Sequence, residues 1–310
     1  MILSITLNPC IDKTIYLEQL QVGSCNRVNS TRTDLAGKGI NVSTVLNHLK
    51  EDTLCMGFNF QNNGSMLEQV LNQRGLKHKF ISTEGSIRTN IKIFDNSCRE
   101  MTEINEAGSF VSASAVHKLL DEIDAFLEHT HILVMSGSIP PGVPTDIYQR
   151  LIRMAHRKEV KTVLDTAGEP LLPGLEEKPY LIKLNSQEFE QAFQLKDASP
   201  TERMEAARRI VVAGVPYLCI SMGADGALLL DKEHTYRAKA LPVELKGLSG
   251  AGDSMVAGMC YAIRKHLNTK EMLGYAMAAA AGSIRQEGTL LAKERDVREL
   301  LSQVEIEVIA

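Results

Sequence analysis

The sequence predicts an α/β protein whose central sheet is mainly parallel and covered by helices on both faces. From residue 112 onward, segments in which apolar residues recur at helical spacing alternate with short apolar runs, which is typical of such a sheet. Glycine, proline and aspartate follow several of the apolar runs, as they do in tight turns after strands. The chain has 310 residues, of which 44% are apolar, so it can bury one large core and carry a small appendage.

The first third of the chain is predicted to contain more strands than helices. The segment 87–94 alternates apolar and polar residues, as a half-buried strand does. Apolar residues at helical spacing predict helices at 40–50 and 65–73. The strands predicted in this part are 2–7, 15–17, 79–82, 87–94 and 99–104.

The rest of the chain is predicted to alternate between helices and strands. The predicted helices are 112–128, 145–157, 186–194 and 201–213, and the predicted strands are 131–135, 160–164, 180–184 and 217–221. Loops rich in glycine, proline, serine or aspartate follow four of these strands, at 136–142, 165–168, 185–186 and 221–226. Because ligands of open α/β sheets bind outside the carboxyl ends of the strands, these loops predict a binding site at that edge. The sequence has no repeat or linker, so a second lobe would be a strand-built insertion.

Composition excludes several classes of function. The net charge is −4, 5% of residues are aromatic and no basic run is present, so we expect no nucleic-acid partner. The N-terminus has no basic leader and the apolar stretch 273–284 is too short to cross a bilayer, so we expect a cytoplasmic protein without a membrane partner. The six cysteines form no Cys-x-x-Cys pair and are expected to be reduced. His129 and His131 lack further ligands nearby in sequence, which disfavours a transition-metal site.

A glycine-rich segment at 248–253 carries the clearest chemical signal. It places Asp253 at the start of a predicted helix, directly after Gly250, Ala251 and Gly252. Successive backbone N–H groups of such a turn, together with the positive end of the helix, form an anion-binding nest. An adjacent aspartate can accept the proton of an attacking hydroxyl. The alternative is that the aspartate only caps the helix.

A second glycine-rich segment precedes the helix predicted at 40–50. Gly37 and Gly39 would let the backbone approach a ligand closely, Asn41 could bond to hydroxyls, and Lys38 supplies a mobile positive charge. The segment is therefore suited to a polar, anionic small molecule, although a solvated lysine in a loop would also fit. The chain lacks the P-loop, G-x-G-x-x-G and protein-kinase H-R-D patterns, which disfavours P-loop enzymes and dinucleotide oxidoreductases.

The order of the motifs along the chain resembles one enzyme family. The motifs are Thr6-Leu7-Asn8-Pro9 with Asp12, Asn26-Arg27, Gly37-Lys38-Gly39-Ile40-Asn41-Val42, Arg88-Thr89-Asn90, Ser136-Gly137-Ser138-Ile139-Pro140, Lys183 with Asn185-x-x-Glu188, and Gly250-Ala251-Gly252-Asp253. Together they resemble the ribokinase-like sugar kinases, and among these the phosphofructokinase B branch that contains 1-phosphofructokinase and tagatose-6-phosphate kinase. The resemblance implies a three-layer αβα fold in one domain, 1–310, with a small β-sheet lid inserted within roughly 10–35 and 87–105. It also suggests a homodimer formed through the lid.

The resemblance assigns roles to individual residues. Asp253 is expected to be the catalytic base, and the anion hole is expected to comprise Gly250, Ala251 and Gly252. The expected substrate-binding residues are Asp12, Arg27, Gly37, Lys38, Gly39, Asn41, Arg88 and Ser136, of which Arg27, Lys38 and Arg88 would hold a phosphate. The expected nucleotide-binding residues are Lys183, Asn185, Ser221, Gly223 and Gly226, with Glu188 holding Mg²⁺ through water.

These roles predict a Mg²⁺- and ATP-dependent kinase for a ketohexose monophosphate, either tagatose 6-phosphate or fructose 1-phosphate. The product would be the 1,6-bisphosphate. The chain departs from the family pattern at Ala36, at Gln61-Asn62 and at Ile87, and these departures leave the choice of sugar open. Two alternatives remain: a kinase for an unphosphorylated sugar or nucleoside, and a sugar-phosphate sensor without turnover.

Overall fold

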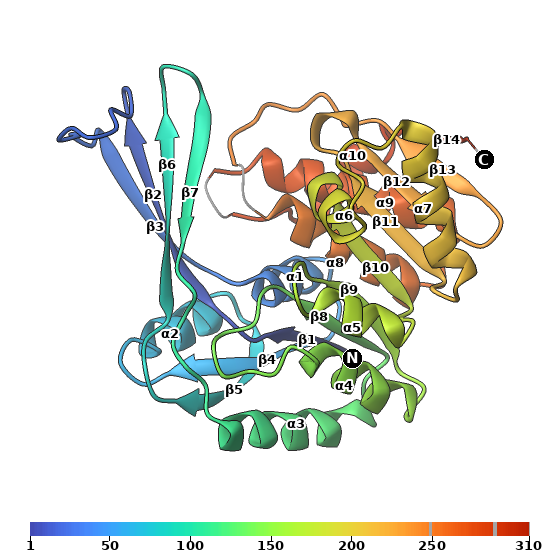
Figure 1. Ribbon diagram of the computed structural model, residues 1–310, viewed down its shortest axis with the longest axis horizontal. Coiled ribbons are helices and arrows are strands. Elements are labelled where there is room, and N and C mark those ends of the chain that lie inside the picture. Colours follow the sequence, from blue (N-terminus) through green and yellow to red (C-terminus); the bar gives the residue numbers. More distant parts are fainter. Residues whose placement is uncertain (248–249, 288–289, 310) are drawn as a thin grey trace.

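The computed structural model describes residues 1–247, 250–287 and 290–309, and the strands in these ranges form two sheets (Figure 1). The strands are β1 (Ile2–Thr6), β2 (Cys10–Leu17), β3 (Ser30–Ala36), β4 (Thr53–Phe60), β5 (Lys77–Thr83), β6 (Arg88–Asp95), β7 (Glu100–Asn105), β8 (Ile132–Ser136), β9 (Lys161–Asp165), β10 (Leu181–Asn185), β11 (Tyr217–Ser221), β12 (Ala227–Leu230), β13 (Thr235–Ala238) and β14 (Ile306–Val308). The larger sheet has the order β14-β13-β12-β11-β10-β9-β8-β1-β4-β5, and the smaller has the order β3-β2-β6-β7.

Helices connect most strands of the larger sheet. They are α1 (Lys38–His48), α2 (Ser65–Gln73), α3 (Ala113–Leu127), α4 (Ile147–His156), α5 (Leu171–Glu176), α6 (Ser186–Ala192), α7 (Pro200–Val212), α8 (Ala251–Arg264), α9 (Thr269–Ile284) and α10 (Glu294–Leu301), with a 3₁₀ turn, η1, at Gly223–Asp225. None of the described helices is long and apolar enough to cross a membrane.

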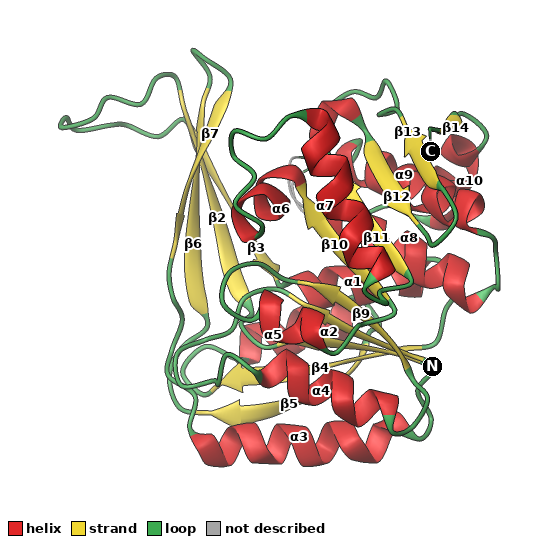
Figure 2. Cartoon of the chain, turned by 45° about the vertical axis from the view of Figure 1, so that its right-hand side comes forward, coloured by secondary structure: helices red, strands yellow, loops and turns green. Residues whose placement is uncertain are grey.

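The strands from β11 to β5 run parallel, and β12, β13 and β14 add an antiparallel edge. Successive side chains of β1 point to opposite faces, so Leu3 and Ile5 join a hydrophobic cluster with α3, α4 and α7, whereas Ile2 joins a second cluster with α1, α8 and α9. Helices therefore cover both faces, as Figure 2 shows. This arrangement confirms the predicted α/β class and the mainly parallel sheet.

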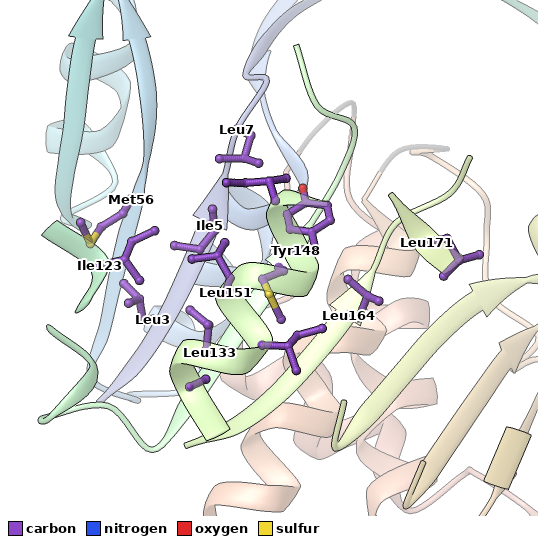
Figure 3. Packing of buried hydrophobic residues seen from close by; sticks show 14 of the residues in the cluster. Leu3, Ile5, Leu7, Met56, Ile123, Leu133, Tyr148, Leu151, Leu164 and Leu171 are labelled. Atoms are coloured by element: carbon purple, nitrogen blue, oxygen red, sulfur yellow. The ribbon is translucent and has the colours of Figure 1, made fainter. Parts of the chain in front are cut away.

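The core also holds a loop at the carboxyl edge of the sheet in place. Figure 3 shows Tyr148 and Leu151 of α4 packed against the side chains that project from β1 and β8. The hydroxyl of the fully buried Tyr148 donates to the carbonyl of Gly137 at 2.9 Å, and the hydroxyl of Thr166 donates to the same carbonyl at 2.9 Å. These two bonds fix the turn that follows β8.

The small sheet stands apart from the main body and is joined to it at one end (Figures 1 and 2). Its two central strands, β2 and β6, are parallel, with Asp12 opposite Asn90 in the register. The outer strands β3 and β7 pair antiparallel with them. Alternate side chains of β2 and β6 therefore share a face, although the two strands lie far apart in the sequence.

The predicted elements that the structure contains begin and end within a few residues of their predicted bounds, except that β2 begins at Cys10 rather than at residue 15. The sequence patterns did not predict β3, β4, the antiparallel edge, α5, α9 or α10. Strand β4 is buried at every position, so its residues show no alternation that would mark a strand. The antiparallel strands β12, β13 and β14 have only three or four residues each, too few for a periodic signal.

Candidate active site

A cavity of about 650 Å³ lies between the small sheet and the carboxyl edge of the larger sheet. The first turns of α1 and α8, which pack against each other, form part of its wall. The cavity is lined by many of the site residues predicted from the sequence: Asp12, Gly37, Lys38, Asn41, Arg88, Ser136, Lys183, Asn185, Glu188, Gly250, Gly252 and Asp253. A cavity of this size suits a small polar ligand.

The start of α8 supplies a carboxylate and a cluster of backbone N–H groups. Gly250 has φ +84°, a left-handed conformation that favours glycine and lets the chain turn into the helix. Asp253, in the first turn, is 7% exposed, and its Oδ2 accepts a hydrogen bond of 2.7 Å from Asn41 Nδ2. Burial raises the pKa of Asp253 above 3.8; Lys38 and Asn41 partly oppose this shift, and Asp165 adds to it. Residues 248 and 249 of this segment lie outside the described residues.

The start of α1 supplies a positive charge beside that carboxylate. Gly37 packs so tightly on β1 that a Cβ there would lie 2.7 Å from Thr6 Cγ2. Lys38 Nζ lies 3.4 Å from Asp165 Oδ2 and 3.9 Å from Glu188 Oε1. Burial alone would lower the pKa of Lys38, but the surrounding carboxylates outweigh burial and raise it, so the ammonium group stays charged.

Asp165, at the end of β9, joins two cationic side chains. Its carboxylate is fully buried and lies 3.4 Å from Lys183 Nζ as well as 3.4 Å from Lys38 Nζ. Burial alone would raise the pKa of Asp165, but Lys183 and Lys38 together outweigh it and lower the pKa. From the sequence alone, residue 165 is recognisable only as the start of a loop. The signal that could have identified Asp165 is a carboxylate that directly follows an apolar strand at the ligand-binding edge.

Lys183 and the start of α6 extend the site toward the next strand. A Cβ on Gly252 would lie 2.8 Å from Lys183 Nζ, so this ammonium group sits beside the first turn of α8. Asn185 caps α6, accepting from the N–H of Glu188, while Glu188 Oε2 accepts from the N–H of Asn185. This capping box leaves Glu188 Oε1 directed to the cavity that Glu188 lines.

Three further predicted residues lie one strand away. Ser221 is paired with Asn185 in the register of β11 and β10. Gly223 and Gly226 have φ values of +59° and +92°, which the tight turn after β11 requires. A Cβ on Gly226 would also lie 1.9 Å from the carbonyl oxygen of Ala238. These three residues share the edge of the sheet with the cavity but do not line it.

Three other predicted residues are also absent from the cavity wall. Arg27 is exposed, in the connection between β2 and β3. Gly39 faces β1, where a Cβ would lie 2.5 Å from the carbonyl oxygen of Ile5, so close packing of α1 accounts for this glycine. Ala251 is the first residue of α8 and does not line the cavity.

The small sheet contributes residues that the sequence analysis did not assign. Asp12 accepts hydrogen bonds from Lys92 Nζ at 2.7 Å, from Asn90 Nδ2 at 3.1 Å and from Cys10 Sγ at 3.3 Å. Burial and the Asp12 carboxylate raise the pKa of the Cys10 thiol to about 12, so the thiol stays protonated and can donate. The sequence signal that could have identified Asn90 and Lys92 is the alternation of 87–94, which places residues 88, 90 and 92 on one face of a strand. From β7, Glu103 also lines the cavity.

The cavity concentrates polar atoms that lack protein partners. Among the described residues, eleven buried side-chain nitrogen or oxygen atoms make no hydrogen bond, and six of the eleven belong to cavity-lining residues. The six are Thr6 Oγ1, Asn8 Oδ1, Asn41 Oδ1, Arg88 Nε, Asn90 Oδ1 and Ser136 Oγ. Because unpaired buried polar groups are costly, their presence indicates a ligand rich in hydroxyl or anionic oxygens.

Comparisons with known proteins agree with this geometry. Residues 5–295 match the family model described as pfkB family carbohydrate kinase. The chain is 34% identical to a 1-phosphofructokinase of Borreliella burgdorferi over 310 residues, which cover 100% of this chain and 99% of the relative. It is 28% identical to a tagatose-6-phosphate kinase of Staphylococcus epidermidis, with 99% of each protein covered. The crystal structure of a possible 1-phosphofructokinase from Thermotoga maritima superposes with a TM-score of 0.90 at 27% identity, covering 100% of both chains.

Replacing the carboxylate that joins the two lysines should destabilise the protein. Asp165→Asn would leave the ammonium group of Lys183, whose side chain is 5% exposed, without its ionic partner, so we expect the free energy of unfolding at pH 7 to fall by about 3 kcal/mol or more. The pKa of Asp165 is lowered below 3.8 in the folded state, so the difference from the unchanged protein should persist at neutral pH and shrink only as the pH falls below that value. Urea denaturation of both proteins at several pH values measures this difference in the free energy of unfolding.

Asp146→Asn provides a matched control. Asp146 also pairs with a cation, Arg150, at 2.9 Å, but both side chains are more than a third exposed. This change should alter the free energy of unfolding by at most about 0.5 kcal/mol. Equal losses in the two variants would contradict a special role for the buried carboxylate.

Proposed function

The chain belongs to the pfkB family of carbohydrate kinases, and we propose that it transfers the γ-phosphoryl group of ATP to the free primary hydroxyl of a ketohexose monophosphate. Tagatose 6-phosphate and fructose 1-phosphate are the two candidate acceptors, and either would give a 1,6-bisphosphate. The observation that carries the proposal is the position of Asp253. Its buried carboxylate lies at the positive end of α8, in the same cavity as Lys38 and Arg88.

In the proposed reaction, Asp253 accepts the proton of the sugar hydroxyl as the hydroxyl oxygen attacks the γ-phosphorus and the bond to the departing ADP breaks. The raised pKa of Asp253 makes it a better proton acceptor than an exposed carboxylate. The hydrogen bond from Asn41 fixes the carboxylate, because Asn41 lies on the adjacent first turn of α1. The proton acceptor is thereby oriented before the substrate binds.

The negative charge of the transferred group would be met by the first turn of α8 and by two ammonium groups. The backbone N–H groups at the start of this helix have no partners within the helix and carry its partial positive charge. Gly250, Ala251 and Gly252 are the proposed anion hole. Lys183 beside Gly252 and Lys38 beside Asp253 would add positive charge.

We propose Mg²⁺ as the metal that accompanies ATP, held through water by Glu188. Among the described residues, no group of three or more His, Cys, Asp or Glu side chains could hold a metal ion alone. A single carboxylate oxygen such as Glu188 Oε1 nevertheless fits Mg²⁺, which usually keeps several waters and binds substrate phosphates with only one or two carboxylates. When bound, the ion would neutralise charge on the ATP phosphates. Asn185, Ser221, Gly223 and Gly226 are the proposed contacts to the nucleotide.

Arg88 favours a phosphorylated sugar over an unphosphorylated one. It lines the cavity, and its buried Nε makes no hydrogen bond within the protein, whereas its Nη1 donates to the carbonyl of Glu106 at 2.9 Å. A guanidinium group anchored at one nitrogen and free at another is suited to a phosphate. Asp12, Gly37, Asn41 and Ser136 are the proposed contacts to the rest of the sugar.

We further propose that the chain acts as one kinase domain in which the small sheet serves as a lid. Closure of the lid over the sugar would exclude water and limit hydrolysis of ATP. Arg27 would need such a movement, or a second subunit, to approach a phosphate. In the part of the chain that the structure describes, no strand pairs with the outer edges of β3 and β7. Pairing or packing between two lids is the proposed route to a homodimer. A cytoplasmic location is proposed because both substrates are intracellular metabolites.

An assay of ADP release with Mg·ATP tests the proposal directly. The acceptors are tagatose 6-phosphate, fructose 1-phosphate, fructose 6-phosphate, fructose and ribose at equal concentrations. Turnover with one ketohexose monophosphate alone would support the proposal and identify the sugar. Turnover with fructose or ribose alone would favour the kinase for unphosphorylated sugars. No turnover, together with a rise in melting temperature on adding a sugar phosphate, would favour the sensor.

Asp253→Asn should lower kcat by at least roughly 100-fold, because a general base contributes about 10²–10⁴ to the rate. The amide keeps the shape of the side chain, so we expect the dissociation constant for ATP, measured by titration calorimetry, to change little. Near-normal turnover in this variant would remove Asp253 from the role of base.

Arg88→Ala should raise KM for the sugar phosphate by roughly tenfold or more while KM for ATP changes little, since a hydrogen bond to a charged group is worth about 1.5–3 kcal/mol. Arg32→Ala is the matched control, because Arg32 also lies in the small sheet but pairs with Asp34 at 2.7 Å and does not line the cavity. Equal changes in both KM values, or the same change in the control, would contradict the assignment.

A further inference from the structure

A buried ion pair occupies one wall of the cavity. Lys92 Nζ lies 2.7 Å from Asp12 Oδ2, and the two side chains are 10% and 8% exposed. Both residues line the cavity. They belong to the neighbouring parallel strands β6 and β2, where Lys92 is paired with Thr14 and Asp12 with Asn90. The pair therefore lies on the inner face of the small sheet.

The stability of the small sheet does not explain this pair. Removing two charges from water costs free energy that their attraction roughly offsets at best, and apolar residues of similar volume often stabilise a protein more. The opposite face of the same two strands has partly buried isoleucines at four of the alternate positions, Ile11, Ile15, Ile91 and Ile93, beside the exposed Lys13. A charged pair on the cavity face alone points to a role in binding the ligand.

The donors to Asp12 show how many acceptor sites of its carboxylate are left for a ligand. An ionised carboxylate has about four lone-pair sites. Asn90 and Cys10 both donate to Oδ1, whereas Lys92 donates to Oδ2. Among the described residues these three donors occupy three of the sites, so about one site remains on Oδ2. A single hydroxyl of a bound sugar can fill it.

We propose that Lys92 is a positioning residue that holds Asp12 so that the remaining site on Oδ2 receives one hydroxyl of the sugar phosphate. This inference rests on the proposed kinase function. Lys92 acts through Asp12, which lies in the small sheet, whereas Asp253 and Lys183 belong to the main body. Lys92 therefore governs affinity for the sugar phosphate and leaves the ATP site and the phosphoryl transfer step unchanged.

The test compares Lys92→Met, which keeps the length of the side chain but removes its charge, with Lys92→Arg, which keeps a charged donor. We expect Lys92→Met to raise KM for the sugar phosphate by roughly tenfold or more. Both kcat and KM for ATP should stay within about threefold of the unchanged enzyme. Lys92→Arg should recover most of the lost affinity. An unchanged KM for the sugar phosphate in Lys92→Met would overturn the inference, as would parallel changes in all three constants.

Lys13→Met is the matched control for the loss of a lysine from the same sheet. Lys13 is exposed and lies on β2 next to Asp12, so its side chain points to the other face. We expect no change in KM. A rise equal to that of Lys92→Met would mean that any lost lysine weakens the small sheet, and would overturn the positioning role.

Combining Lys92→Met with Asp12→Asn tests whether Lys92 acts through Asp12. If it does, Lys92→Met should change KM by less than about twofold once Asp12 has been replaced, because coupled residues are not additive. Full additivity would overturn the inference. If Lys92→Met does not fold, Asn90→Ala can replace it, because Asn90 is another donor to Asp12. An unchanged affinity of Asn90→Ala for the sugar phosphate would show that the donors around Asp12 do not position it, and would overturn the inference.

Titration calorimetry with fructose 1-phosphate and with tagatose 6-phosphate separates this inference from the proposed function. If the protein without substitutions binds one of these two sugar phosphates but releases no ADP, the proposed kinase activity is overturned and the positioning role of Lys92 is not. The dissociation constants of the Lys92 variants would then decide the positioning role by the same fold-changes.

Discussion

The ionic contacts of Asp165 hold the two halves of the active site together. Strand β9 lies between β8 and β10 in the sheet, so its last residue stands near the middle of the carboxyl edge. From there Asp165 contacts Lys38, at the start of α1, and Lys183, on β10. A fully buried carboxylate is tolerated only where cations compensate for its lost hydration. The contacts therefore join the proposed sugar side and the proposed nucleotide side of the cavity electrostatically, so that the charge of each of these three groups depends on the other two.

The sequence carried most of the information about the main body, because parallel strands and their turns leave local signals. Apolar runs predicted β1, β8, β9, β10 and β11, and the loops after four of them predicted the edge where the cavity lies. The glycine-rich starts of α1 and α8 were also recognisable, since glycine and aspartate at a helix start have a local cause. Their meeting through Asn41 and Asp253 depends on the packing of α1 against α8, which no local pattern reveals.

The remaining site residues could not be predicted because their roles depend on contacts between distant segments. Lys92 is an ordinary lysine in a polar alternation until β6 lies beside β2, and Asp165 is an ordinary loop residue until two lysines converge on it. The opposite error arose at Gly39. Gly39 lies in the sequence among residues that line the cavity, yet it faces β1, and the glycine allows α1 to pack closely on that strand. Nearness in sequence to a binding residue therefore did not establish a contact with the cavity.

The parallel pairing of β2 with β6 also sets an order for folding. The intervening residues, 18–87, include β4 and β5, which belong to the larger sheet. Closing a long loop costs entropy that only the subsequent contacts recover. The hairpin of β2 and β3 can form from local contacts, whereas the pairing of β6 with β2 must close the loop 18–87, so we expect β6 to join the small sheet after β3. We therefore expect the face that β2 and β6 share, with Asp12 and Lys92 on it, to be assembled later than the hairpin of β2 and β3.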